Sequence, residues 1–270
     1  MNLRRFIHIF GSTPPMVYVA RLVYERRFRS VAGRGLFRGV YGDFAAAAAA
    51  APSGIPLGYD HAAAAEMYAE RPIFPEDYAL LYWLRPLLAS GARVLDFGGH
   101  AGGMFDAFGE LQQWPTDLEW TIYDVPKVVA QGEARNAARV HPVSRFTSRL
   151  DEAPEADVLL ASGSPQYCDE EFADSVLSLR KAPHHIIVNQ VPLHDGEPFV
   201  TLQNIGTAFC PYWIRNRESF LRPLLDSGYE LVDMWTNPGK ECRIPTYPRV
   251  TRPTYFGSYL RHHDASSPQP

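Results

Sequence analysis

The sequence predicts an α/β fold: a doubly wound, Rossmann-like sheet of seven strands that follows an N-terminal helical extension. Two observations carry this prediction. The apolar run at residues 92–97 breaks directly into the glycine cluster Gly98-Gly99-His100-Ala101-Gly102-Gly103, which is typical of a buried parallel strand that turns into a helix. Further apolar runs then alternate with helical segments, except that the last two, residues 229–235 and 254–260, have no helix between them.

Residues 1–40 form a basic segment in front of the sheet. They contain eight arginines and one acid, Glu25, and residues 14–24 have a helical pattern with prolines in the first turn. Such a helix can lie on an anionic membrane surface. The alternative is a solvated arm that packs on the domain or on a partner subunit, which is what charge runs more often are.

Three helices are expected between this segment and the first strand. The alanine run at residues 45–51 follows Asp43, a good N-cap. Residues 61–71 and 75–89 follow, and Ser90-Gly91 ends the last helix. We therefore expect an arm and helical cap over residues 1–90, the sheet domain over residues 91–263 and a disordered tail at residues 264–270.

The remaining elements alternate. Strands are expected at residues 118–124, 144–147, 157–162 and 184–190, and helices at residues 104–113 and 126–140. Asp169 is expected to cap a helix that reaches residue 181. Residues 191–215 are long and weakly periodic, as a lid or substrate loop would be. Asn216 caps a helix that Gly228 follows, and Pro223 should kink or shorten it.

Composition narrows the class of protein. The chain has 270 residues and a formal net charge of -4, which argues against a general nucleic-acid binder. Cys168, Cys210 and Cys242 are far apart and form no Cys-x-x-Cys motif, so neither a disulfide framework nor a zinc site is indicated, and a reducing cytoplasm is expected. No apolar run is long enough to span a membrane.

The glycine cluster is typical of a cofactor-binding turn. Its glycines let the backbone approach a ligand, and the free N–H groups of the next helix point into the turn. A dinucleotide fingerprint needs Gly-x-Gly-x-x-Gly, but His100 stands at the middle glycine. The pattern acid-x-Gly-x-Gly-x-Gly is met by Asp96, Gly98 and Gly102, again with His100 in the middle, and it resembles motif I of class I S-adenosylmethionine (SAM) methyltransferases. The alternative is a turn that binds nothing.

Asp124 ends the second strand. A carboxylate at this position can accept both ribose hydroxyls of an adenosine, or it can cap the helix that begins near Pro126, and the two roles can coexist. Polar residues after strand 157–162 should lie beside the reactive part of the cofactor. The expected cofactor-binding residues are Asp96, Gly98, Gly99, His100, Gly102, Asp124, Val125, Ser162 and Gly163.

Several short motifs recur together in one family. They are Gly39-Val40-Tyr41-x-x-Phe44, Gly58-Tyr59-Asp60, Leu95-Asp96-Phe97-Gly98-Gly99, Trp120-x-x-x-Asp124-x-Pro126, Ser162-x-x-x-Gln166-Tyr167, Pro192-Leu193, Thr201-x-Gln203 and Pro211-x-Trp213. With the seven strands, they resemble the SAM-dependent methyltransferases of bacterial surface-polysaccharide gene clusters. The resemblance covers residues 39–235 and implies SAM as cofactor and polysaccharide biosynthesis as the setting. The sequence departs from the family at two positions. His100 replaces a glycine of motif I, and Gln190 stands where an arginine is expected.

Methyl transfer needs an acceptor atom held in line and, for an oxygen acceptor, a base within reach. The candidates are Tyr167, His194 and Asp195, with Tyr167 better suited to shaping the pocket. His100 could bind the methionine carboxylate or only cap the turn. Stacking on a sugar ring, or packing in the core, is expected of Tyr167, Phe199, Phe209, Tyr212 and Trp213.

The leading hypothesis is therefore O-methylation of a small or carbohydrate-type acceptor, without a metal. The alternatives are a nicotinamide-dependent oxidoreductase, disfavoured by the missing middle glycine, and a degenerate SAM-fold protein that binds a partner or membrane through residues 1–40.

Overall fold

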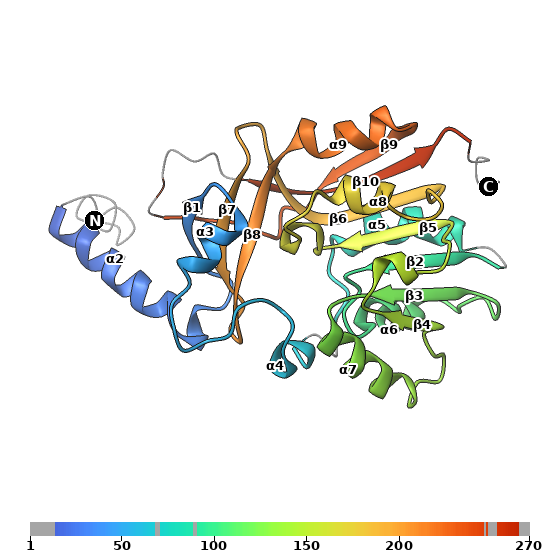
Figure 1. Cartoon of the computed structure of the whole chain (residues 1–270), viewed down its shortest axis with the longest axis horizontal. Coiled ribbons are helices and arrows are strands. Elements are labelled where there is room, and N and C mark those ends of the chain that lie inside the picture. Colours follow the sequence, from blue (N-terminus) through green and yellow to red (C-terminus); the bar gives the residue numbers. More distant parts are fainter. Residues whose placement is uncertain (1–13, 68–70, 89–90, 246, 248–252, 265–270) are drawn as a thin grey trace, which may run out of the picture.

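The computed structural model describes residues 14–67, 71–88, 91–245, 247 and 253–264. At its centre seven strands lie in the order β4 (Arg145–Thr147), β3 (Glu119–Tyr123), β2 (Arg93–Phe97), β5 (Val158–Ser162), β6 (His185–His194), β10 (Thr254–His262) and β9 (Tyr229–Thr236). The five strands β4, β3, β2, β5 and β6 pair in parallel, whereas β10 is antiparallel to β6 and β9. The predicted doubly wound sheet of seven strands is confirmed (Figure 1).

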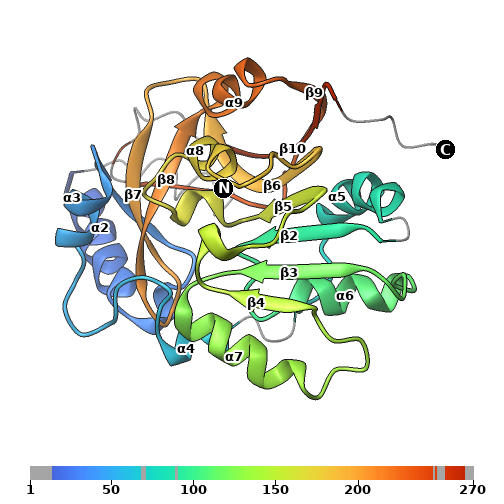
Figure 2. The ribbon, with the colours of Figure 1, turned by 45° about the vertical axis from the view of Figure 1, so that its right-hand side comes forward.

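Helices cover both faces of this sheet, as Figure 2 shows. They are α5 (Asp77–Leu84), α6 (Gly103–Leu111), α7 (Pro126–Asn136), α8 (Phe172–Leu177) and α9 (Arg217–Asp226). Successive residues of a strand point to opposite faces, so Val94 packs in one cluster with Phe108 of α6 while Leu95 packs in another with Phe172 of α8. Because both faces are buried, the strand sequences are continuously apolar rather than alternating.

A second, antiparallel layer consists of β1 (Phe37–Tyr41), β7 (Phe199–Asn204) and β8 (Phe209–Asn216). The end of β8 pairs in parallel with the end of β6 and so joins the layer to the central sheet. The predicted lid or substrate loop at residues 191–215 is therefore wrong. Nearly all residues of β7 and β8 are buried, so neither strand shows the apolar–polar alternation that would have identified it.

Strand β6 bends at Gln190. Its pairing with β5 ends at Asn189, opposite Ser162, and its register with β10 shifts between Phe256 and Ser258. Gln190 has a φ of 58°, which is uncommon for a residue other than glycine. An irregularity of this kind redirects a side chain at the edge of a sheet. Here it places Gln190 beside a cavity.

The N-terminal part contains α2 (Pro14–Phe28), the 3₁₀ turn η1 (Val31–Gly33), β1, α3 (Phe44–Ala49) and α4 (Ala62–Ala65). Asp43 caps α3 by accepting the Ala46 N–H at 2.7 Å, as predicted. The helix expected at residues 61–71 is much shorter, because within the described residues only the four of α4 are α-helical. Residues 1–13, including Arg4 and Arg5, and the expected tail beyond residue 264 lie outside the described residues.

Other helix ends follow the sequence signals unevenly. Asn216 caps α9 through the N–H groups of Glu218 and Ser219, as predicted. Helix α9 continues past Pro223 to Asp226, so the proline does not end it. Helix α8 begins at Phe172, with Glu171 rather than Asp169 at its N-cap. The other 3₁₀ turns are η2 (Arg85–Leu87), η3 (Leu150–Glu152) and η4 (Pro165–Tyr167).

The boundary expected at residue 90 stays a prediction. Strand β1 lies before it and pairs with β7 after it, so the N-terminal segment contributes a strand to the same layer as the later part of the chain. Among the described residues, no helix is both long and apolar enough to cross a membrane.

Candidate functional site

A cavity of about 890 Å³ lies where β2, β3, β5 and the paired part of β6 end. The carboxyl ends of parallel strands form one of its walls, which is where open α/β sheets bind ligands. Strands β1 and β8 and the segment after β9 supply the opposite wall. Eight of the nine predicted cofactor-binding residues line it: Asp96, Gly98, Gly99, His100, Asp124, Val125, Ser162 and Gly163.

The glycine turn is shaped by Asp96. This side chain is buried, and the Trp120 indole N–H donates to its Oδ2 at 3.3 Å. A Cβ atom on Gly99 would lie 2.5 Å from the Asp96 carboxyl carbon, so any larger residue would displace the acid. Gly98 has a φ of 72°, which suits glycine. The turn therefore brings backbone, with no intervening side chain, to the cavity.

Asp124 holds the same turn from the neighbouring strand. Its Oδ2 accepts the His100 N–H at 2.9 Å, and its Oδ1 accepts the Val125 N–H at 2.7 Å. Val125, not Asp124, is the N-cap of α7, and the N–H of Lys127 is accepted by Asp60. Each Asp124 oxygen keeps a lone pair for a ligand.

Both acids have raised pKa values. Burial raises the pKa of Asp96 to about 7, to which the nearby Asp124 adds, while Trp120 and Arg71 act in the opposite direction. Burial likewise raises the pKa of Asp124 to about 6, against the two N–H bonds that it accepts. Two coupled acids in one cavity favour a ligand that brings positive charge or hydroxyl donors.

His100 occupies the position of the missing middle glycine. Its φ of 54° lies in the left-handed region, which histidine visits more readily than most residues. Its Nε2 lies 3.0 Å from the Ala64 carbonyl oxygen, and burial lowers its pKa. The ring therefore ties the turn to α4 as a neutral donor, and both roles considered for His100 stay predictions.

Gly102 lies outside the cavity, contrary to its predicted role. It is the N-cap of α6 with a φ of 89°, and a Cβ there would lie 2.6 Å from an Arg139 guanidinium nitrogen. Arg139 donates to the Ala101 carbonyl and to both oxygens of Asp106. Glycine is needed at this position because a larger residue would collide with Arg139, whose side chain stabilises the turn.

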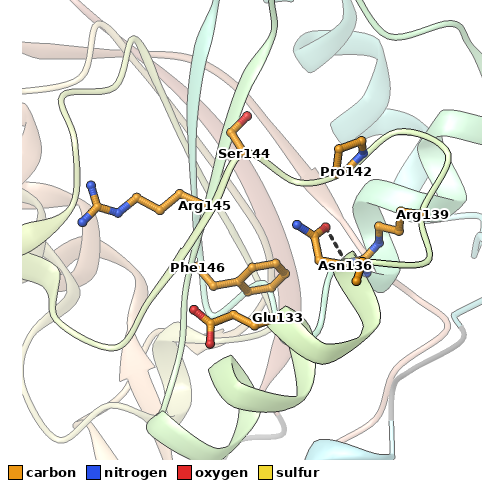
Figure 3. Close-up of a pocket in the computed structure, with 8 residues that line it drawn as sticks. Glu133, Asn136, Arg139, Pro142, Ser144, Arg145 and Phe146 are labelled. Atoms are coloured by element: carbon orange, nitrogen blue, oxygen red, sulfur yellow. Dashed lines mark hydrogen bonds between the residues drawn. The ribbon is translucent and has the colours of Figure 1, made fainter.

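Arg139 and Asn136 also line a second hollow, between α7 and β4 (Figure 3). The Asn136 side chain exchanges two hydrogen bonds with the Val143 backbone and accepts one from Arg139. These polar groups already hold the α7–β4 connection together. The polar residues that line this hollow are therefore engaged in holding α7, β4 and the glycine turn together.

Arg71 lines the cavity and is held by Asp77, a polar pair that the sequence analysis missed. Asp77 is fully buried and binds Arg71 at 2.8 Å, the Phe74 N–H at 2.9 Å and Gln190 at 3.4 Å. The second terminal nitrogen of Arg71, Nη1, is buried without a hydrogen-bond partner in the described structure. No local motif marks Arg71 as a ligand-binding residue.

Lys240 is the second group that the sequence analysis missed. Its ammonium contacts the Gln190 side-chain oxygen and lies 5.7 Å from the centre of the Tyr255 ring. Burial, with Arg71 nearby, lowers the pKa of Lys240 to about 8, although Glu76 and Asp77 raise it. The only signal in the sequence is a lysine within the turn Pro238-Gly239-Lys240, directly after a strand.

Aromatic rings form the far wall. Tyr167 contacts Tyr59 and Tyr212 edge to face at 4.9 and 5.0 Å, and its hydroxyl donates to Gln203 at 2.6 Å. The hydroxyls of Tyr212 and Tyr255 are 2.8 Å apart. Of the aromatic residues expected to stack on a substrate, Tyr167 and Tyr212 line the cavity, whereas Phe199, Phe209 and Trp213 do not.

Two of the three predicted catalytic residues lie outside the cavity. His194 is buried at the end of β6 and packs edge to face on Phe199 at 5.4 Å. Asp195 is at the surface and pairs with Arg217. The extension of β6 past Gln190 carries both of them away from the strand tips, which their sequence position after the expected strand 184–190 did not reveal. Tyr167 alone remains in contact with the cavity.

In the described part of the chain, neither a metal cluster nor a reactive thiol accompanies these groups. The described residues contain no group of three His, Cys, Asp or Glu that could hold a metal ion. Cys168 and Cys210 line the cavity as free thiols, and burial raises their pKa values to about 11 and about 12. Both are therefore protonated at neutral pH, which makes them poor nucleophiles.

Comparison with known proteins finds similarity at the level of structures. No family model and no curated protein matches the sequence. The chain is similar to the CcbJ methyltransferase from Streptomyces caelestis, with 14% identity, a TM-score of 0.47 and coverage of 73% of this chain and 95% of that one.

Two structures solved with SAM are also similar. The glycopeptide N-methyltransferase MtfA has 13% identity, a TM-score of 0.46 and coverage of 73% and 96%. The magnesium protoporphyrin IX methyltransferase ChlM from Synechocystis has 12% identity, a TM-score of 0.46 and coverage of 68% and 77%.

Proposed function

We propose that this protein is a SAM-dependent methyltransferase that methylates a hydroxyl group of a small, carbohydrate-type acceptor. One observation carries the proposal. Two neighbouring parallel strands end in acids beside a large cavity: Asp124 accepts a backbone N–H of the glycine turn, and Asp96 packs against Gly99 of the same turn. An adenosyl ligand needs this combination of ribose acceptor and open backbone.

The residues present fit this cofactor. Asp124 offers lone pairs to a ribose diol, and Gly99, whose Cβ would collide with Asp96, keeps backbone rather than a side chain at the cavity. The free Nη1 of Arg71 suits the methionine carboxylate. The buried acids Asp96 and Asp124 suit a ligand whose sulfonium and ammonium groups are positive. When bound, SAM supplies an electrophilic methyl group.

The acceptor belongs at the aromatic wall. Tyr59, Tyr167 and Tyr212 present ring faces and hydroxyls, which together suit a sugar ring with its apolar and hydroxylated sides. The similarity of the sequence motifs to methyltransferases of surface-polysaccharide clusters supports the same class of acceptor. The free, buried thiols Cys210 and Cys242 are in keeping with a reducing cytoplasm.

Lys240 is the proton acceptor in this proposal, in place of His194 and Asp195. Its pKa of about 8 leaves a fraction of the amine neutral at neutral pH. With SAM and an acceptor bound, the neutral amine would take the proton that the acceptor hydroxyl loses, and SAM would supply the methyl group to that oxygen and leave as S-adenosylhomocysteine. Gln190 and Tyr255 hold the amine in the cavity.

The test is transfer of a radiolabelled methyl group from SAM to a panel of monosaccharides and glycosides. The wild type should release S-adenosylhomocysteine in step with labelled sugar. Lys240→Met should bind SAM as tightly as the wild type but transfer at least about tenfold more slowly. Label on no hydroxylated acceptor, although SAM binds, would contradict the assigned acceptor, and full activity of Lys240→Met would contradict the proton acceptor.

A further inference from the structure

We propose that helix α2 docks the protein onto an anionic lipid membrane surface. Among the described residues, the contacts that attach helix α2 to the rest of the molecule lie near its C-terminal end. The Tyr24 hydroxyl donates to the Phe37 carbonyl at 2.6 Å, Glu25 pairs with Arg38 at 3.1 Å, and Phe28 is buried against Phe209 at 5.2 Å. The earlier turns of α2 extend away from both sheets (Figure 1).

The extended part of α2 exposes apolar side chains. Tyr18, Val19, Leu22 and Val23 are 63%, 57%, 52% and 62% exposed. At a rotation of 100° per residue these four occupy less than half of the helix circumference, opposite the side on which Tyr24 and Phe28 contact the body. A short helix gains little stability in water unless its apolar face is covered. We therefore expect a binding partner to cover this face.

Arginines near the face, of which Arg26 and Arg29 continue it towards the C-terminal end of the helix, select the covering partner. Arg21, Arg26, Arg27 and Arg29 are all exposed. Residues 1–40 carry eight arginines and one acid, whereas the whole chain has a formal net charge of -4, so the remainder is strongly acidic. Pairing α2 with the same helix of a second copy would bring these arginines together and repel them. A lipid surface offers apolar depth to the valines and phosphates to the arginines.

The attachment of α2 gives the docking a consequence. The chain passes from α2 through η1 into β1, and Gly35 before this strand and Phe37 at its start line the cavity. The end of the cavity with the aromatic wall is therefore the end nearest to α2 in the chain. Docking through α2 would hold this end, rather than the glycine turn, next to the lipid surface. The docking itself does not rest on the proposed function.

The experiment is sedimentation of the full chain with vesicles of phosphatidylcholine alone or of phosphatidylcholine with phosphatidylglycerol. The wild type should bind only the anionic vesicles, and added salt should weaken the binding. Arg26→Glu with Arg27→Glu should lower the partition coefficient at least about tenfold. Leu22→Glu with Val23→Glu should abolish binding at low salt as well.

The matched control is Arg149→Glu with Arg222→Glu. Both arginines are exposed, at 62% and 56% of the side chain, and lie outside α2, so the pair makes the same change in charge elsewhere. It should bind like the wild type. Equal loss in the control and in the α2 variants would reduce the effect to net charge and overturn the proposal. A wild type that does not bind anionic vesicles would also overturn the proposal. Analytical ultracentrifugation would then show whether the protein is a monomer or a dimer that Leu22→Glu dissociates, and either result would contradict membrane docking.

Discussion

The two ends of the cavity are built in different ways. The end at the glycine turn uses backbone and two acids from neighbouring strands, and its main contacts lie between residues 96 and 125. The aromatic end uses side chains from β1, η4, β8 and β10, which are far apart in the sequence. The first end is fixed by local geometry, whereas the second depends on long-range pairing. This difference suits a constant cofactor at one end and a specific acceptor at the other.

Replacing Asp124 should separate the two ends most clearly. Asp124→Ala would remove the two charge-assisted hydrogen bonds to a ribose that we propose, so SAM should bind about 100-fold more weakly by calorimetry. The control is Asp169→Ala, which removes an exposed acid at the other end of the same cavity. It should leave cofactor affinity unchanged. Equal affinities of Asp124→Ala and the wild type would refute the ribose assignment.

The pH dependence of folding stability and of SAM affinity should also arise at the glycine-turn end of the cavity. Burial raises the pKa of Asp96 to about 7 and that of Asp124 to about 6. Because these values exceed the unfolded value near 4, the stability that the two acids contribute is fully present below about pH 4 and is lost as pH rises through 6 to 7.

Cofactor affinity should change in the opposite sense. A ribose hydroxyl and a cationic ligand prefer the ionised acids, so SAM affinity should rise by up to about tenfold per pH unit between about pH 5.5 and 7. Asp124→Asn should flatten this rise. Melting curves of the free protein and calorimetry with SAM measure the two trends, and an affinity independent of pH would show that neither acid senses the cofactor.

A smaller effect is expected at Gly99. Gly99→Ala would place a methyl group 2.5 Å from the Asp96 carboxyl carbon, at a cost of ~1–3 kcal/mol in free energy of unfolding. It should also weaken SAM binding about tenfold, because the turn must move. Gly42→Ala is the control, since a Cβ there meets nothing within 4 Å. If both variants bind SAM alike, close approach at Gly99 has no role.

The smallest effect on the cofactor should come from the aromatic end. Tyr167→Phe removes the hydrogen bond to Gln203 and should cost ~1 kcal/mol in free energy of unfolding. SAM affinity should stay within about twofold of the wild type, while turnover of a hydroxyl acceptor falls. A large loss of SAM affinity in Tyr167→Phe would mean that the two ends are not independent.

The sequence was informative where contacts are local. The strand–glycine–helix turn, the acids Asp96 and Asp124 and the caps at Asp43 and Asn216 were each predicted from a few neighbouring residues. Seven strands could be placed because buried parallel strands are continuous apolar runs. Gly102 shows a limit even there, because a motif glycine can serve the packing of Arg139 instead of the ligand.

The sequence was less informative where distant segments meet. Strand β1 pairs with β7 across more than half of the chain, and no local pattern announces that pairing. Without that pairing, the sequence predicts a loop in place of β7 and β8 and places His194 and Asp195 at a strand tip. Arg71 and Lys240 lie at the cavity through long-range contacts with Asp77 and Gln190, which no local pattern announces.

The most direct test of this account is calorimetric titration of the full chain with SAM, S-adenosylhomocysteine and NADH. Asp124, Gly99 and Arg71 as arranged here predict micromolar binding of both adenosyl compounds and no binding of NADH. Binding of NADH alone would contradict the central claim and assign the glycine turn to a dinucleotide.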